Sequence, residues 1–132
     1  MVQKKIVEGA VVSGRYEAKF FTDLDWVKKQ LKEKFGFDPF PGTLNLKIES
    51  EEYNKLLQEL RKHPGVELVP PSPDFCRAVC FRVKVNGKVE GVIVLPHVQD
   101  YYTNILEVIA PVKLRDEFNL KDGDKVTLEI EI

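Results

Sequence analysis

The fold class is decided by one stretch of the sequence, Phe75-Cys-Arg-Ala-Val-Cys-Phe-Arg-Val-Lys-Val-Asn86-Gly87-Lys-Val-Glu-Gly-Val-Ile-Val-Leu95. Residues 75–85 and 89–95 alternate between apolar and polar side chains, which is the period of a β-strand. Asn86-Gly87 joins them and is the strongest short hairpin signal, because both residues tolerate the positive φ angles of a tight turn. The stretch therefore predicts an antiparallel hairpin.

Further strand-like segments lie on both sides of this hairpin, at 4–13, 44–49, 66–69, 105–109 and 126–132. Gly9 inside the first of them predicts a bulge or a close backbone approach. A first helix is expected to open at Thr22, with Asp25 at capping-box spacing, and to end at Gly36. Ser50 is expected to cap a second helix. The strands follow one another in hairpin-like order and the helices do not alternate with them, which favours a small closed β-barrel with appended helices over a doubly wound parallel sheet.

Length and composition predict one domain with a buried core. The chain has 132 residues, of which 43% are hydrophobic and 31% charged, a balance typical of a folded domain. We therefore expect residues 1–132 to form a single domain. The 20 basic and 21 acidic residues nearly cancel. This argues against a nucleic-acid partner, because binding to a phosphate backbone needs a surplus of positive charge.

The same reading predicts a cytoplasmic protein with no membrane partner. No apolar run reaches the about 18 residues that a membrane-spanning helix needs. The opening Met1-Val-Gln-Lys-Lys-Ile6 lacks the apolar centre of a secretory signal. Cys76 and Cys80 are the only cysteines and have no metal-ligand spacing, so both are interpreted as small buried hydrophobes. A monomer is expected.

The first candidate for chemistry is the stretch Pro39-Phe-Pro-Gly-Thr-Leu-Asn45. Thr43 and Asn45 lie two residues apart at the start of a strand, so their side-chain oxygens face the same side. A hydroxyl and an amide oxygen are neutral, hard ligands that suit Mg²⁺ already neutralised by nucleotide phosphates. The alternative is that Thr43 completes a turn and Asn45 bonds to the backbone, and spacing alone favours this alternative.

The second candidate is Leu106-Glu-Val-Ile-Ala-Pro-Val-Lys-Leu-Arg115. Glu107 shares a strand face with Ile105 and Ile109, so it either points inward as a functional carboxylate or faces water on an edge strand, and the pattern leaves both open. The turn that follows, with Lys113 and Arg115, can hold phosphate or a base. Ordinary surface charge is the alternative for both cations.

The third candidate is Ser13-Gly-Arg-Tyr-Glu-Ala-Lys19, where a glycine precedes two cations. It can cradle phosphates, but it has neither the glycine spacing nor the Lys-Ser/Thr ending of a P-loop. By itself this signal is weak.

Taken together, these stretches resemble the archaeal CTP-dependent riboflavin kinases. The match runs in order over nearly the whole chain, through 8–14, 39–46, 106–115 and the closing Phe118-Asn-Leu-Lys-Asp-Gly-Asp124. The resemblance implies an α+β, mainly β fold, a small six-stranded cradle-loop β-barrel with two appended helices. It also implies transfer of the γ-phosphoryl group of CTP to the 5′-hydroxyl of riboflavin, which gives FMN and CDP.

The resemblance also implies roles for the matching residues. Thr43 and Asn45 would hold Mg²⁺. Gln99 and Glu107 would contact the flavin, and as a hypothesis Glu107 orients or deprotonates the attacking hydroxyl. The nucleotide would be held by Gly14, Arg15, Tyr16, Glu17, Ala18 and Lys19 together with Val112, Lys113, Leu114 and Arg115.

Two other classes of function stay open. A non-catalytic sensor of cytidine nucleotides or flavin is favoured by two departures from the family pattern: Arg15, Tyr16 and Ala18 occupy a loop that is richer in glycine in the family, and Gln99 replaces a common Thr. A DNA-binding regulator is favoured by the strand–turn ending at 120–126, which resembles swapped-hairpin DNA-binding folds. The near-zero net charge counts against the regulator.

Overall fold

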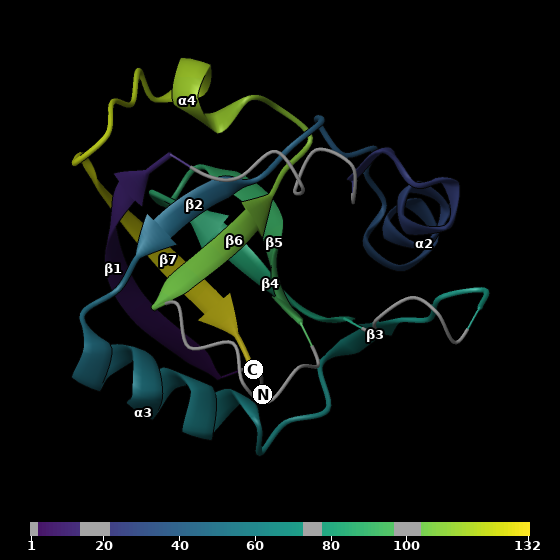
Figure 1. Cartoon of the computed structure of the whole chain (residues 1–132), viewed down its shortest axis with the longest axis horizontal. Helices are drawn as coiled ribbons and strands as arrows, with labels where there is room; N and C mark the ends of the chain where they lie inside the picture. Colours follow the sequence, from purple (N-terminus) through teal and green to yellow (C-terminus); the bar gives the residue numbers. More distant parts are fainter. Residues whose placement is uncertain (1–2, 14–21, 73–77, 97–103) are drawn as a thin grey trace.

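The computed structural model describes residues 3–13, 22–72, 78–96 and 104–132, and in it an antiparallel sheet closes into a barrel (Figure 1). The strand order is β3-β4-β5-β6-β2-β1-β7, and a further pairing of β4 with β7 closes six strands into a ring, with β3 added to the outside of β4. The strands are β1 (Lys4–Val12), β2 (Leu44–Lys47), β3 (Val66–Leu68), β4 (Ala78–Val85), β5 (Val89–Pro96), β6 (Ile105–Ile109) and β7 (Lys125–Glu131). The predicted small, mainly β barrel is confirmed.

The helices of the described part are α2 (Asp25–Phe35), α3 (Ser50–Leu60) and the short α4 (Leu114–Glu117). Figure 1 shows α3 and α4 on opposite sides of the barrel. The end near α4 also holds the last residues of β1 and β6 and the first residues of β2 and β7, so five segments meet there. Within the described residues, no helix has the length and apolar character needed to cross a bilayer.

The β4–β5 hairpin forms where the sequence predicts it. Asn86 and Gly87 have φ angles of 50° and 69°, and Val85 pairs with Val89 across the turn. Gly9 is a point of close approach, as predicted: a Cβ there would lie 2.7 Å from Ile48 Cδ1 and 2.9 Å from Leu46 Cβ. Only glycine lets β1 pass this close to β2.

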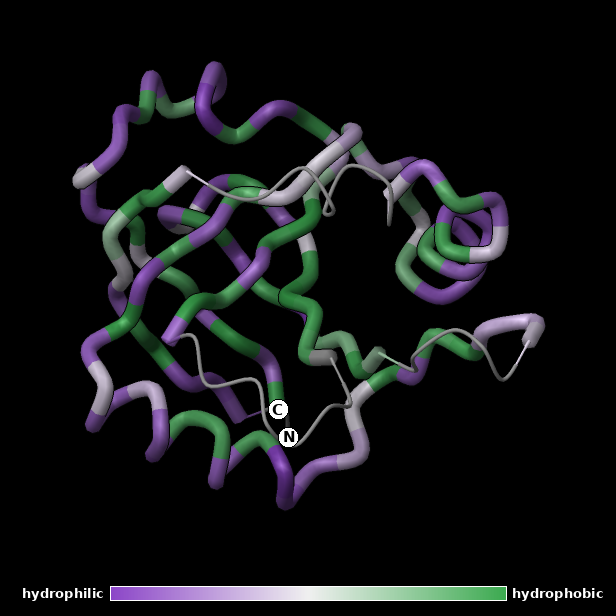
Figure 2. The backbone as a smooth tube through the Cα atoms, in the orientation of Figure 1, coloured by the Kyte–Doolittle hydropathy of each residue, from purple (hydrophilic) through white to green (hydrophobic). Residues whose placement is uncertain are grey.

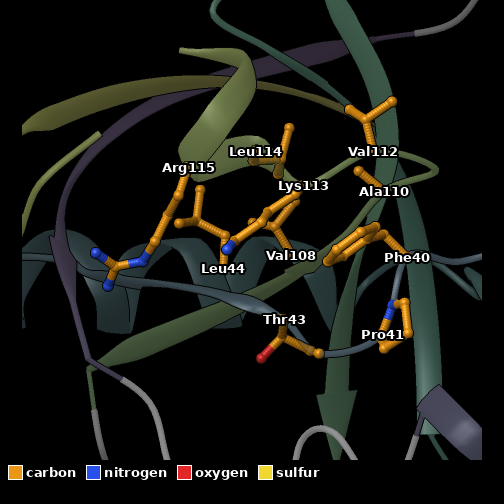
Figure 3. Close-up of a pocket in the computed structure, with 11 residues that line it drawn as sticks. Phe40, Pro41, Thr43, Leu44, Val108, Ala110, Val112, Lys113, Leu114 and Arg115 are labelled. Atoms are coloured by element: carbon orange, nitrogen blue, oxygen red, sulfur yellow. The ribbon is translucent and has the colours of Figure 1, made fainter. Parts of the chain in front are cut away.

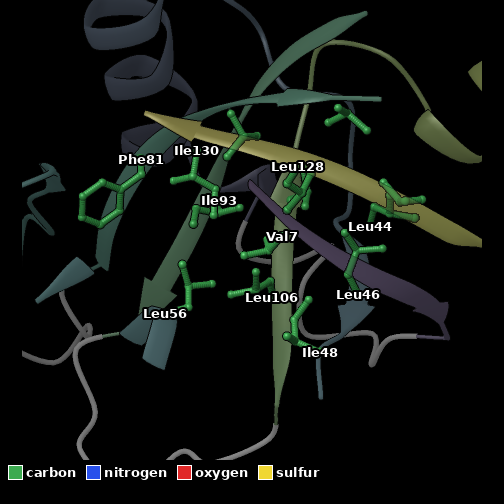
Figure 4. Packing of buried hydrophobic residues seen from close by; sticks show 14 of the residues in the cluster. Val7, Leu44, Leu46, Ile48, Leu56, Phe81, Ile93, Leu106, Leu128 and Ile130 are labelled. Carbon is green, nitrogen blue, oxygen red and sulfur yellow. The ribbon is translucent and has the colours of Figure 1, made fainter. Parts of the chain in front are cut away.

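Alternate side chains of the strands fill the barrel interior (Figure 4). This follows from the period of two along each strand, which sends every second side chain to the same face. In Figure 2 the strands carry most of the hydrophobic residues, whereas the segment around α4 is largely hydrophilic. The most deeply buried interior residues include Val7, Leu46, Leu56, Ile93, Leu106, Leu128 and Ile130.

A second, smaller core lies between α2 and the outer face of the sheet. Val27, Leu31 and Phe35 of α2 share this core with residues of β4, β5 and β6. Cys80 is among them, as the sequence predicts, and burial raises the pKa of its thiol to about 12. Cys76 lies outside the described residues. Gly36, in the left-handed region with a φ of 81°, ends α2 as expected.

Both predicted helix caps are wrong. The residue before α2 is Leu24, and the Thr22 hydroxyl instead accepts a hydrogen bond from the Gly42 N–H at 2.7 Å. Ser50 is the first residue of α3, and the cap is the Glu49 carboxylate, which accepts from the N–H groups of Glu51 and Glu52 at 3.1 and 3.2 Å. A carboxylate beside the positive end of a helix is a stronger acceptor than a hydroxyl.

Candidate functional site

An open cavity of about 210 Å³ lies at the barrel end near α4 (Figure 3). Two of the stretches that the sequence analysis selected meet in it, although they are far apart in the chain. The Phe40 N–H donates to the Ala110 carbonyl at 2.8 Å, and Leu44 pairs with Val108 between β2 and β6. The lining residues are Phe40, Pro41, Gly42, Thr43, Leu44, Val108, Ala110, Val112, Lys113, Leu114 and Arg115.

Thr43 lines this cavity and carries an unpaired polar atom. Its hydroxyl oxygen is buried and forms no hydrogen bond within the described part of the chain. Nearly all buried polar groups in proteins have a partner, so an orphaned hydroxyl points to a partner outside the described part of the chain. Gly42 immediately before it has a φ of 98°, and its N–H is held by Thr22, which sets the direction of the chain at Thr43.

Asn45 is the second oxygen-bearing residue of the pair. Only 7% of its surface is exposed, and its side-chain nitrogen donates to the Thr43 carbonyl at 3.4 Å. Because the nitrogen is used in this way, the carboxamide oxygen is the atom left to accept a donor or a cation. The side chains of Leu44 and Leu46 point into the barrel core, so Asn45 lies on the outer face between them.

Thr43 and Asn45 each carry a neutral side-chain oxygen of the kind that a hard divalent cation accepts. Neither carries charge, and in the described ranges no group of three or more Asp, Glu, His or Cys side chains stands ready to bind a metal. A cation held here would therefore depend on neutral oxygens from the protein and on negative oxygens from a bound phosphate. This is the ligand chemistry of Mg²⁺ that arrives with a nucleotide.

Glu107 faces away from the barrel interior, and the inward alternative is wrong. Its neighbours Leu106 and Val108 fill the barrel core, so Glu107 lies half-buried on the outer face with Ile109. The edge-strand alternative is also wrong, because β6 is paired on both sides, with β2 and β5. Glu107 lies directly opposite Asn45 on β2 and Val94 on β5.

Residues 112–115 bring two cations to the cavity. The Lys113 ammonium is only weakly paired, at 4.0 Å from Asp116, and half of its side chain is exposed. The Arg115 guanidinium is held more firmly, because Nη2 donates to Asp122 Oδ1 at 2.7 Å. Leu114 is buried in the barrel core and also lines the cavity. Both cations therefore lie at one cavity, and their contact with a ligand stays a prediction.

Comparison with known proteins then places the chain in a family. Residues 11–130 match the family model CTP-dep_RFKase, which is described as "Domain of unknown function DUF120". The chain belongs to the CTP-dependent riboflavin kinase family. The resemblance seen in the sequence is therefore confirmed.

Several relatives of this chain are riboflavin kinases of archaea. The chain is 43% identical to a riboflavin kinase of Archaeoglobus fulgidus, over 94% of this chain and 54% of the relative. It is 42% identical to a riboflavin kinase of Pyrobaculum aerophilum, over 92% of this chain and 59% of the relative. It is 35% identical to one of Methanosarcina acetivorans, over 94% of this chain and 53% of the relative. The chain thus spans about half the length of the curated relatives it matches.

Within this family frame, the structure brings together some of the predicted residues. Thr43 and residues 112–115 line one cavity, whereas Asn45 and Glu107 lie side by side on the outer face and do not line it. Residues 14–19 and Gln99 lie outside the described residues. Sequence reasoning missed Phe40 as a cavity wall and Asp122 as the partner of Arg115. Phe40 lies in the motif 39–45 and Asp122 in the motif 118–124, so the motifs indicated the right segments but not these two side chains.

Proposed function

We propose that residues 1–132 form a riboflavin kinase barrel domain that transfers the γ-phosphoryl group of CTP to the 5′-hydroxyl of riboflavin, giving FMN and CDP. The observation that carries the proposal is the cavity that Thr43 lines together with Lys113 and Arg115, since the buried Thr43 hydroxyl has no hydrogen bond in the described part of the chain. Such a combination suits a metal-bound phosphate chain. Membership of the family and the names of the relatives support the same reaction.

The donor nucleotide is assigned to the cavity. Phosphoryl transfer needs little covalent chemistry from the protein, since the rate depends on positioning and on stabilising negative charge. Lys113 is the cation best placed to meet the phosphates, because its ion pair with Asp116 is long and exposed. Residues 14–19 are proposed to complete the nucleotide site. Mg²⁺, held by Thr43 and Asn45, would neutralise charge on the phosphate oxygens.

The acceptor flavin is assigned to the outer face of β2 and β6. Thr43 lines the cavity, and two residues later Asn45 lies opposite Glu107 on that outer face. The proposed metal ligands therefore stand between the donor site and the acceptor site, where a transferred phosphoryl group must pass. Glu107 is proposed to orient the 5′-hydroxyl of riboflavin or to accept its proton, and Gln99 to contact the flavin.

The test is an incubation of the protein with riboflavin, Mg²⁺ and each of CTP, ATP, GTP and UTP in turn, followed by chromatography for FMN. FMN formed with CTP supports the proposal. The amounts of FMN formed with the four nucleotides give the preference for the phosphate donor. Tight CDP binding without any FMN would favour a non-catalytic sensor. Retention on DNA at physiological salt, again without FMN, would favour a regulator.

A matched pair of variants links any activity to the site. Thr43→Val removes the unpaired hydroxyl and keeps the shape of the side chain. Thr127→Val makes the same change on the half-buried outer face of β7, away from the cavity. Activity that falls in the first variant and survives in the second belongs to the cavity.

A further inference from the structure

The closing motif 118–124 has no role in the proposed reaction, but its Asp122 contacts Arg115, a residue that lines the cavity. Asp122 extends from the turn between α4 and β7 and holds two partners with its two carboxylate oxygens. Oδ1 accepts from Arg115 Nη2 at 2.7 Å, and Oδ2 accepts from the Ser13 hydroxyl at 2.6 Å. One carboxylate therefore links α4 to the end of β1. Its partner Ser13 is 109 residues from Asp122 in the sequence.

Backbone hydrogen bonds fix the turn that carries Asp122. The Gly123 N–H donates to the Val11 carbonyl at 2.7 Å, and the Val11 N–H donates to the Asp124 carbonyl at 2.8 Å. Asp124 also closes the turn itself, because its carboxylate accepts from the Lys121 N–H at 2.8 Å. Asp122 is thus presented from a rigid platform that is bonded directly to β1.

The Arg115 side chain lies between this platform and the cavity. Its guanidinium contacts Asp122 and, at 3.4 Å, the Val12 carbonyl, and about a third of the side chain remains exposed. An arginine without such partners samples many rotamers, and ordering it on ligand binding costs entropy. Held by Asp122, Arg115 is ordered before any ligand arrives.

We propose that Asp122 is a positioning residue for the nucleotide site, which acts by holding Arg115 at the cavity and Ser13 at the end of β1. This inference rests on the proposed function, because it takes the cavity as the nucleotide site. The two cations then have different roles. Arg115 stays paired with Asp122 and forms part of the cavity wall, while Lys113 contacts the phosphates. The hydrogen bonds from Ser13 and then from Arg115 also lower the pKa of the Asp122 carboxyl.

The experiment compares the wild-type protein with Asp122→Asn, Asp122→Ala, Arg115→Gln and the double variant D122N/R115Q. The matched control is Glu51→Gln, which removes a carboxylate from an exposed ion pair with Lys55 on α3, on the far side of the barrel. CDP binding with Mg²⁺ is measured by calorimetry. The KM values for CTP and riboflavin are measured separately, and thermal unfolding is recorded without ligand.

We expect Asp122→Ala to weaken CDP binding about tenfold and Asp122→Asn to weaken it less, since asparagine keeps part of the hydrogen bonding but loses the charge. The KM for CTP should rise by the same factor, and the KM for riboflavin should stay constant. D122N/R115Q should be no weaker than the poorer single variant, because both changes remove the same contact. Glu51→Gln should bind CDP like the wild type.

The outcomes separate the inference from the proposed function. A wild-type protein that binds neither CDP nor CTP overturns the proposed function. A wild-type protein that binds CDP, with both Asp122 variants binding equally well, overturns the inference alone. Equal losses for CTP and riboflavin that follow a fall in unfolding temperature also overturn it, since they show a structural role only. If Asp122→Ala does not fold, the milder Asp122→Asn decides.

Discussion

Asn45 on β2 lies directly opposite Glu107 on β6, and both point to the outer face of the barrel. Residues opposed in this way in an antiparallel pair have Cβ atoms about 4.5–5.5 Å apart, so their side chains are neighbours. Thr43, two residues before Asn45, lines the cavity instead. This relationship puts a proposed metal ligand beside a proposed flavin contact, and it makes the roles of the two separable by mutation.

Replacing Glu107 with Gln is expected to lower kcat at least about tenfold, because the amide cannot accept the proton of the attacking hydroxyl and orients it less well. The KM for CTP should not change, since Glu107 does not line the cavity. Steady-state kinetics of FMN formation give both values. Glu129→Gln on the outer face of β7 is the matched control, and full turnover by Glu107→Gln would remove the proposed role.

Replacing Thr43 with Val should separate activity from stability. The Mg²⁺ concentration for half-maximal activity should rise about tenfold or more, because loss of one charge-assisted oxygen contact corresponds to about 1.5–3 kcal/mol. The unfolding temperature should stay the same or rise, since the hydroxyl is buried without a hydrogen bond in the described part of the chain and valine preserves its shape. A marked fall in unfolding temperature would show that the hydroxyl has a structural partner.

Phe40 is expected to contribute to nucleotide affinity. It is 40% exposed although it is a large apolar residue, and it forms one wall of the cavity (Figure 3). An aromatic ring that stacks on a base contributes about 1–3 kcal/mol, so Phe40→Ala should weaken CDP binding about tenfold. Calorimetry measures this, and Ile6→Ala, an exposed apolar residue of β1 outside the cavity lining, is the control. Unchanged CDP affinity would mean that the base packs elsewhere.

The stability contributed by Asp122 should depend on pH in one direction. Hydrogen bonds from Ser13 and then Arg115 lower its pKa from the ordinary value of 3.8, so the folded state favours the charged carboxylate. The difference in unfolding free energy between wild type and Asp122→Asn should therefore be constant above about pH 5 and shrink as the pH falls below 3.8 through the folded-state pKa. Chemical unfolding of both proteins at several pH values tests this. A difference that grows towards acid pH would contradict the assigned contacts.

Local patterns in the sequence predicted the elements well. The Asn86-Gly87 turn and the end of α2 at Gly36 depend on residues within a few positions of one another, and both are confirmed. The two predicted caps were wrong. Thr22 is bonded to the distant Gly42, and Ser50 accepts from the distant Asn104 side chain at 2.8 Å, while the neighbouring Glu49 caps α3.

The candidate site divides in the same way. Its residue types and motifs, from Thr43 and Asn45 to Lys113 and Arg115, could be read directly from the chain, because ligand chemistry is a property of the side chain. Which of them share a cavity could not be read. The face taken by Glu107 depends on which side of β6 the barrel closes, and alternation alone does not distinguish the two faces.

By itself, then, the sequence determined the strands, the hairpin, the helices and the chemical groups available for a phosphoryl-transfer site. Only the tertiary structure decided that Phe40 meets Ala110, that Asn45 meets Glu107, and that Asp122 holds both Ser13 and Arg115. The physical reason is the distance along the chain over which each kind of interaction acts. Backbone conformation follows from the steric and hydrogen-bonding preferences of near neighbours, whereas these contacts exist only after strand register and barrel closure have brought distant segments together.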